Sequence, residues 1–261
     1  SNGSKGVVKI NQIEEFDTAA NNAFSITRNS KILVEEYIEG FEIGADCLVY
    51  GDSFEIILSR ERVKTNYSKQ VNSLQQIYGS YWPAQLNEFQ EKELRANISK
   101  IINVFGLKNT PLIVQAIVKE NQIFIIEFAP RIGGGENYEI IKRKTGFDHI
   151  DAAIKSFLGE ELSVQLNPDP YIYFDNYLYT KEGKFGSVSG FDSLIKEGII
   201  DYAKVYKQKG DKIGGEITSS NRVGVFVAKS ESKESLNKKV SLAFGNLTIL
   251  DINQNDMKRD I

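Results

Sequence analysis

The chain has 261 residues, of which 41% are hydrophobic and 26% are charged, and its formal net charge is −3. This composition allows a sizeable core in one large domain or two smaller lobes, and the charge gives no indication of nucleic acid or a membrane as a partner. A single cysteine, Cys47, excludes an internal disulfide and fits a cytoplasmic location, while a single histidine, His149, excludes a multi-histidine metal site. Any chemistry must therefore rest on carboxylates, amides, lysine, arginine and backbone groups.

The chain opens on a glycine-, serine- and lysine-rich run at residues 1–6, without a methionine, and we expect it to be a segment of a longer protein. Glycines in this run let backbone N–H groups surround an anion, and Lys5 adds positive charge. A flexible surface turn is the alternative interpretation.

The first part of the chain alternates predicted strands and helices. The helix at 87–105 is the clearest, because apolar residues recur at three- and four-residue steps and Gly106 follows the last of them. The predicted strands are 7–10, 31–37, 42–50, 54–58, 112–118 and 122–128, and the predicted helices are 14–25, 87–105, 137–144 and 148–158. A loop with three aromatic residues is expected at 78–83.

A change of composition near residue 162 and the two prolines of residues 167–170 indicate a linker. We therefore divide the chain into residues 1–162 and residues 170–261. The second part is expected to hold strands at 171–179, 184–189, 203–206, 222–229 and 247–252, and a helix at 232–244 with Ser232 or Ser235 as its cap.

Acidic residues stand where the predicted strand 31–37 ends. Glu35 and Glu36 lead to a turn at Gly40, and Glu42 opens the next strand. The backbone at such a strand exit can bond an adenine, and a carboxylate at Glu42 could accept both ribose hydroxyls. The alternative is an ordinary solvated strand end.

Gln115 and Glu127 are polar residues inside two apolar strands that a short hairpin joins. If residue 121 is the midpoint of the hairpin, the two residues are cross-strand neighbours on one face. A carboxylate among apolar residues is unfavourable unless it is paired or bound to a cation, and an oxygen-rich pair suits magnesium. A buried ion pair with a lysine or arginine is the alternative.

A glycine-rich loop, Pro130 to Gly135, follows directly. Its glycines permit close approach of a ligand, and Arg131 could hold a phosphate or carboxylate with its planar guanidinium. A flexible loop without a ligand is the alternative here.

In order and spacing, these four segments resemble the ATP-grasp superfamily, and within it the carbamoyl-phosphate-synthase-like and amino-acid-ligase-like branch. The resemblance covers residues 1 to about 160. From residue 170 onward the chain is similar to the C-terminal lobe of amino-acid ligases through Arg222-Val223-Gly224 and residues 257–261. It implies an α+β fold of mainly antiparallel sheets, with an ATP-grasp domain at 1–162, truncated on its N-terminal side, and a small α+β lobe at 170–261.

The resemblance also implies roles for individual residues, with ATP and Mg²⁺ as the bound groups. A mobile lid over the phosphates would contain Ser4, Lys5 and Gly6. Glu35, Glu36 and Ile38 would lie at the adenine edge, and Glu42 would contact the ribose. Gln115 and Glu127 would hold the metal. Arg131 would stabilise the γ-phosphate and the acyl-phosphate oxygens.

Two departures from the family pattern matter. Ala129 stands where a metal-binding Asn is common, and the strand and lysine that normally precede the lid are not in this chain. Because it begins inside the lid, we expect the chain on its own to bind ATP weakly and not to turn over.

The resemblance implies an ADP-forming ligase that joins a carboxylate, possibly an amino acid, to an amine. It leaves two alternatives, a carbamoyl-phosphate-synthase-like or purine-pathway ligase and a non-catalytic ATP-binding module. Expected partners are the small-molecule carboxylate and amine substrates, with a homodimer as a possible assembly. The charge cluster at 60–64 and the aromatic loop at 78–83 lie in stretches that approach the substrate in relatives, although simple packing of Trp82 is an equal alternative.

Overall fold

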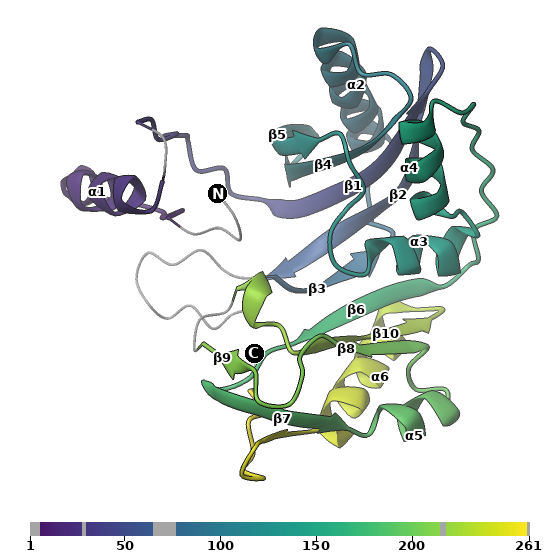
Figure 1. The fold of residues 1–261 in the computed structure, drawn as a ribbon. Helices are drawn as coiled ribbons and strands as arrows, with labels where there is room; N and C mark the ends of the chain where they lie inside the picture. The colour runs from purple at the N-terminus through teal and green to yellow at the C-terminus, as the bar shows by residue number, and fades with distance from the viewer. Residues whose placement is uncertain (1–5, 28–29, 65–76, 215–217, 260–261) are drawn as a thin grey trace.

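The computed structural model describes residues 6–27, 30–64, 77–214 and 218–259 (Figure 1). In this part of the chain, one antiparallel sheet has the strand order β5-β4-β1-β2-β3-β6-β10-β8, and a small second sheet has the order β11-β7-β9. The strands are β1 (Phe41–Tyr50), β2 (Ser53–Lys64), β3 (Ile77–Trp82), β4 (Thr110–Lys119), β5 (Gln122–Ala129), β6 (Ile172–Leu178), β7 (Gly183–Ser189), β8 (Tyr202–Val205), β9 (Lys212–Ile213), β10 (Gly224–Ser230) and β11 (Thr248–Asp251). The helices are α1 (Phe16–Ile26), α2 (Glu88–Phe105), α3 (Asn137–Thr145), α4 (His149–Leu158), α5 (Phe191–Lys196) and α6 (Lys233–Asn246).

Helices cover both faces of the large sheet. On one face, alternate residues of β1 from Ile43 to Val49 pack in one cluster with Leu94 of α2. Helix α6 packs against β6 and β10. On the opposite face of β1, Leu48 packs in a cluster with Ile140 of α3 and Ala152 of α4. The polar residues of β1 alternate with those that face α2, so they point to the side of α3 and α4, and the candidate site lies there.

The large sheet joins the two parts that the sequence divides. Strand β3, from the first part, pairs with β6, from the second. Between them, residues 160–171 form no helix or strand, and the predicted linker at 167–170 lies within this segment. The backbone there is fastened by Lys144 Nζ, which donates to the carbonyl oxygens of Asp169 and Tyr171 at 2.8 Å and 2.7 Å. The division into a domain at 1–162 and a lobe at 170–261 stays a prediction.

Helix α2 forms where the apolar periodicity predicts it. Its N-cap Asn87 accepts a hydrogen bond from the Gln90 backbone N–H, and the Gln90 side chain accepts one from the Asn87 backbone N–H. The helix ends at Gly106, whose φ of 59° is the left-handed conformation that glycine adopts readily. Both ends of this helix are thus set by local sequence.

Two predicted strands are wrong. Residues 31–37 form no strand, and Leu33 and Val34 are 79% and 64% exposed. Of residues 7–10, only Val8 takes part in a bridge. An extended apolar segment becomes a strand only beside a partner, and in the described part of the chain residues 31–37 have none. Helix α1 likewise buries none of its residues and stands away from the large sheet (Figure 1).

One predicted loop is a strand. Residues 77–82 form β3, which links β2 to β6 in the middle of the large sheet. The Trp82 side chain is fully buried, and its Nε1 donates to Asp175 Oδ1 at 2.7 Å. Trp82 therefore packs the core and does not line a substrate pocket. The sequence also did not predict the short α5 and β9.

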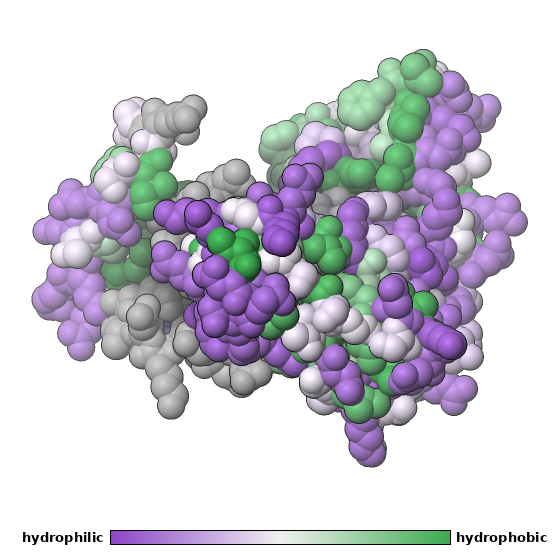
Figure 2. Space-filling model, turned by 60° about the horizontal axis from the view of Figure 1, so that its bottom comes forward, coloured by the Kyte–Doolittle hydropathy of each residue, from purple (hydrophilic) through white to green (hydrophobic). Residues whose placement is uncertain are grey.

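On the face drawn in Figure 2, hydrophobic residues form several patches among hydrophilic ones. Within the described residues, no helix is long and apolar enough to cross a bilayer.

A pH dependence of stability is expected from His149. It is the first residue of α4, capped by Asp148, and its side chain is 1% exposed. Burial lowers the pKa of this imidazole, and the nearby Asp46 carboxylate opposes the shift only in part. Because the pKa of this imidazole is lower in the folded state than in the unfolded state, the neutral side chain stabilises the fold above the unfolded-state pKa of about 6.5. This contribution is lost as the pH falls through the folded-state pKa.

We therefore expect the free energy of unfolding to decrease between about pH 7 and pH 5, in the window that a histidine of unfolded pKa about 6.5 sets. Urea unfolding at a series of pH values measures this decrease. In a His149→Leu variant the decrease should be much smaller over the same range. Since the chain has no other histidine, an equal decrease in the variant would contradict the assignment.

Candidate active site

The pair predicted to hold a metal comes together on adjacent strands. Gln115 of β4 lies opposite Glu127 of β5, and Gln115 Nε2 donates to Glu127 Oε1 at 2.8 Å. This confirms that the two residues are cross-strand neighbours.

The pairing depends on a β-bulge. Lys119 pairs with Gln122 across the turn, and a regular hairpin continued from there would set Gln115 opposite Ile126. The register shifts by one residue between Gln115 and Ala116, which places Glu127 opposite Gln115. A hairpin midpoint at residue 121 thus predicts the correct pair, although it does not predict the bulge that brings the pair together. Without the bulge, Glu127 would point to the other face of the sheet.

The expected apolar surroundings of the carboxylate are wrong. Glu127 is exposed, and its neighbour Ile126 is 43% exposed. A carboxylate at this position stays hydrated and open to a ligand. Gln115 is half-buried, and it is Gln115, not Glu127, that bonds to a cationic side chain.

That cationic side chain is Arg62 of β2. Its Nη1 donates both to Gln115 Oε1 and to Glu42 Oε1, so it joins the predicted metal and ribose residues. Lys64 Nζ lies 3.3 Å from the other Glu42 oxygen. Burial lowers the pKa of Arg62, while the Glu42 carboxylate favours its charged form. Glu42 is therefore a paired carboxylate, and a ribose would have to share it with two cations.

A second polar centre anchors the glycine-rich loop to β1. Asp46 is fully buried and forms an ion pair with Arg60. Asp46 Oδ1 accepts a hydrogen bond from the Gly133 backbone N–H at 3.1 Å, and Oδ2 accepts one from Asn137 Nδ2 at 3.1 Å. A Cβ at Gly133 would collide with Asn137 Nδ2 and Asp46 Oδ1, which explains a glycine at this position. The loop is thus a fixed element and not a flexible one.

Glycine also makes room for the arginine of this ion pair. A Cβ at Gly44 would lie 2.7 Å from Arg60 Cζ. The guanidinium of Arg60 therefore lies directly over the β1 backbone. In the sequence, the only sign of this ion pair is Gly44-Ala45-Asp46 inside an apolar strand, and the sequence analysis did not predict a site there.

Arg131 opens this loop at the end of β5. Its backbone N–H donates to the Ala129 carbonyl at 2.8 Å, and its Nη1 donates to the Ile132 carbonyl at 2.8 Å. The side chain is exposed, and no described carboxylate lies within 4.0 Å of its guanidinium. Its charge is therefore available to an anionic ligand.

The remaining predicted nucleotide residues are less fully assembled. Ser4 and Lys5 lie outside the described residues, and Gly6 takes a left-handed φ of 75°. Glu35 and Glu36 are exposed and Ile38 is half-buried, in a segment without regular structure. The structure brings Glu42, Gln115 and Glu127 together through Arg62, and within the described residues it shows no hydrogen bond or ion pair from these three to Glu35 or Glu36.

The model of the ATP-grasp domain family matches residues 1–139, more than half of the chain. The chain belongs to the ATP-grasp family. The matched segment contains all ten of the predicted site residues, from Ser4 to Arg131.

Individual relatives of this ATP-grasp chain have low sequence identity to it. The carbamoyl phosphate synthase large chain of Thermoanaerobacter pseudethanolicus is 26% identical over 166 residues, which cover 61% of this chain and 14% of that protein. The L-amino acid ligase of Bacillus licheniformis superposes with a TM-score of 0.76 at 17% identity, over 94% of this chain and 61% of that one. The biotin carboxylase domain of Hydrogenobacter thermophilus 2-oxoglutarate carboxylase was solved as a dimer with MgADP, ADP and bicarbonate. It superposes with a TM-score of 0.73 at 16% identity, over 99% of this chain and 56% of that one.

These matches confirm the predicted α+β ATP-grasp fold. The chain spans less than two thirds of the length of each relative. They agree with the antiparallel sheets and packed helices described above.

The oxygen ligands of this ATP-grasp site fit magnesium, with phosphate oxygens and water filling the rest of its coordination shell. The described residues contain no group of three or more acidic, histidine or cysteine side chains that could enclose a metal. Magnesium does not need such a group, because it usually binds one or two carboxylates together with substrate phosphates. Glu127 supplies an exposed carboxylate, and Ala129 supplies no ligand. The Gln115 amide oxygen accepts from Arg62, so it can bind the metal only if Arg62 releases it.

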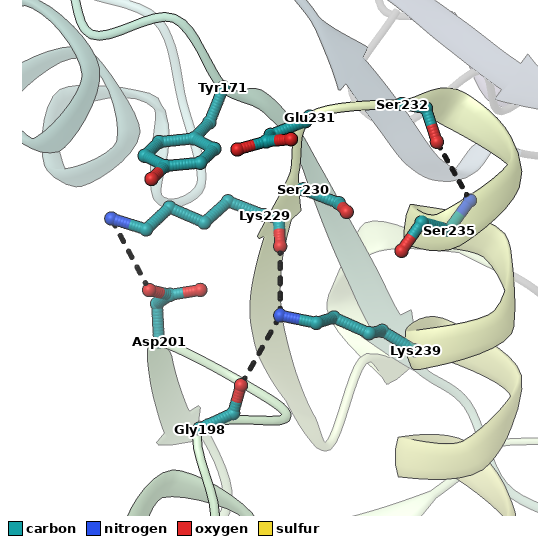
Figure 3. A pocket seen from close by; sticks show the side chains of 9 residues that line it. All are labelled: Tyr171, Gly198, Asp201, Lys229, Ser230, Glu231, Ser232, Ser235 and Lys239. Carbon is teal, nitrogen blue, oxygen red and sulfur yellow. Dashed lines mark hydrogen bonds and ion pairs between the residues drawn. The ribbon is translucent and has the colours of Figure 1, made fainter.

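A hollow of about 460 Å³ lies apart from this site, where β10 meets α6 (Figure 3). Its two lysines are engaged: Lys229 lies 3.6 Å from Asp201, and Lys239 donates to the carbonyls of Gly198 and Lys229. Because these cations already have partners, the hollow offers little to an anionic ligand.

Proposed function

We propose that this chain is the ATP- and magnesium-binding part of an ADP-forming ligase that joins a carboxylate to an amine. The observation that carries the proposal is the Gln115–Glu127 pair, whose carboxylate is exposed, followed four residues later by an exposed Arg131 that no described carboxylate pairs with. The family match over the same segment supports it.

Each residue has one task in the proposed reaction. Glu127 and Gln115 hold magnesium, which when bound supplies positive charge to the triphosphate. Arg131 holds the γ-phosphate while a carboxylate oxygen of the substrate attacks the γ-phosphorus and ADP leaves. The amine then attacks the carbonyl carbon of the acyl phosphate and phosphate leaves.

The nucleotide contacts complete the proposal. Glu42 holds the ribose, with Arg62 and Lys64 balancing its charge. The backbone of Glu36 and Ile38 bonds the adenine edge, and Glu35 lies beside them. Ser4, Lys5 and Gly6 belong to a lid that excludes water from the acyl phosphate. The cytoplasmic location and the homodimer stay predictions.

Two alternatives depend on Gln115 and Ala129. Gln115 and the 26% identity to a carbamoyl phosphate synthase large chain favour a carbamoyl-phosphate-synthase-like ligase, and Ala129 counts against it. The same Ala129 and Gln115 favour a module that binds ATP without turnover, because they leave a single carboxylate in the metal pair.

Release of ADP by the full-length protein separates these functions. With ATP, magnesium and a mixture of the common L-amino acids, we expect ADP release that stops when magnesium is chelated. ADP release with bicarbonate and ammonia, and none with amino acids, would favour the carbamoyl-phosphate-synthase-like function. Binding of ATP without ADP release for any carboxylate would favour the binding module.

A further inference from the structure

Arg222 is a half-buried cation that forms no ion pair with any carboxylate the structure describes. It lies two residues before β10, its Nε donates to Tyr179 OH at 2.8 Å, and its guanidinium stacks on the Tyr177 ring at 3.6 Å. Stacking on one aromatic ring and bonding through Nε hold the guanidinium plane in place. The two terminal nitrogens are left to bond something else.

Three other cations of the second polar centre and its neighbours differ from Arg222 in being paired. Arg60 pairs with Asp46, Arg62 pairs with Glu42, and Lys204 Nζ lies 3.1 Å from Glu136 Oε1. Among the described residues, no carboxylate lies within 4.0 Å of Arg222, and no side chain or carbonyl accepts from its terminal nitrogens. Arg222 therefore supplies one uncompensated positive charge.

The carboxylate of Asp175 does not fill this role. It is 1% exposed, its Oδ1 accepts from Trp82 Nε1, and its Oδ2 has no hydrogen-bond partner. It is near enough to act on the charge of Arg222 but makes no ion pair with it. The geometry thus leaves the edge of the guanidinium free.

Arg222 stands beside the glycine-rich loop. A Cβ built on Gly135 would lie 2.8 Å from Tyr177 OH, so the loop that begins at Arg131 touches the ring on which Arg222 stacks. On the other side, Arg62 is close enough for the charges of Tyr177 and Arg222 to affect it. Arg222 therefore lies next to the glycine-rich loop that Arg131 opens and near Arg62, while β10 is several strands away from β5, the strand of Glu127, in the sheet order.

We propose that Arg222 binds the non-reacting carboxylate of the amine substrate, so that this substrate is an amino acid and not ammonia or a simple amine. The proposal rests on the proposed function, because the carboxylate to be activated must lie near Arg131 and the metal pair. A second anion site, away from the metal, fits the carboxylate of the other substrate. One free cation with a planar edge suits a carboxylate, with its single charge and two oxygens, better than a phosphate dianion.

The test is a titration that does not depend on turnover. The full-length protein, loaded with magnesium and a non-hydrolysable ATP analogue, is titrated calorimetrically with each of the twenty common L-amino acids and with the matching amino-acid amides. We expect at least one amino acid to bind while its amide binds at least tenfold more weakly. In an Arg222→Gln variant, the dissociation constant of that amino acid should rise about tenfold to a hundredfold, and that of the amide should stay within a factor of three.

Controls separate binding from folding and from the proposed function. Arg222→Gln should bind the ATP analogue as the wild type does, and Arg95→Gln, which removes an exposed arginine paired with Glu55, should change neither dissociation constant. If Arg222→Gln unfolds, Tyr179→Phe, which removes the acceptor of the Arg222 Nε hydrogen bond, should still weaken amino-acid binding and not amide binding.

Three results would overturn the proposal: unchanged discrimination in Arg222→Gln, no binding by any of the twenty amino acids, or binding of inorganic phosphate through Arg222 in place of an amino acid. Failure of the wild type to bind the ATP analogue would instead contradict the proposed function.

Discussion

A Glu127→Gln variant of the full-length protein is expected to release ADP about a hundredfold more slowly than the wild type, or slower still. Glu127 is the only carboxylate of the metal pair, and the amide that replaces it carries no charge to attract magnesium. Charge stabilisation by a bound metal contributes several kcal/mol to such a transition state, and each 1.36 kcal/mol corresponds to a factor of ten in rate. The variant should also need a higher magnesium concentration to reach half of its maximal rate.

The matched control is Glu120→Gln, which removes an exposed carboxylate from the turn of the same hairpin. This variant should keep the wild-type rate and magnesium dependence. Because Glu127 is exposed and, among the residues that the structure describes, bonds only to Gln115, its replacement should leave the melting temperature almost unchanged. Equal ADP release by Glu127→Gln and the wild type would disprove the metal assignment.

The metal pair shows which parts of a site a sequence can predict. Gln115 and Glu127 lie in one hairpin, and local spacing was enough to set them side by side. The bulge that completes their register was not predicted, because it depends on how β5 packs against the rest of the sheet. The exposure of Glu127 was not predicted either, since it depends on which elements cover that edge.

Contacts between distant segments account for the residues that the sequence reading missed. Arg62 is 53 residues from Gln115, and Gly133 is 87 residues from Asp46. In the sequence, Arg62 was one member of a charge cluster, and Asp46 was an acid among the apolar residues inside a predicted strand. Their partners become visible only when β1, β2 and β4 are placed next to each other.

The wrong strand at 31–37 has a related cause. Alternation and apolar content describe a segment that is able to form a strand, but the hydrogen bonds of a strand need a neighbour. Strand β3 shows the converse, because its glycine and aromatic residues resemble a loop until β2 and β6 pair with it on both sides. In both segments, tertiary contacts determine whether a strand forms.

The largest loss of stability is expected for Asp46→Ala, at about 3–5 kcal/mol in the free energy of unfolding. The substitution leaves the buried Arg60 guanidinium without its counter-ion, and the Gly133 N–H and Asn137 Nδ2 without their acceptor. Urea unfolding measures the loss. The control is Asp151→Ala, which breaks the surface pair with Lys155, where an effect within about 1 kcal/mol is expected.

The double variant Asp46→Leu with Arg60→Met tests the origin of that loss. If the loss comes mainly from an unpaired buried charge, removing both charges should restore much of the stability. The loop anchor would still be absent, because leucine cannot accept from Gly133 or Asn137. The double variant should therefore be stable but slow in ADP release, since Arg131 opens a loop that is no longer held to β1. A double variant as unstable as Asp46→Ala would show instead that the hydrogen bonds to the loop, and not the ion pair, hold this part of the fold together.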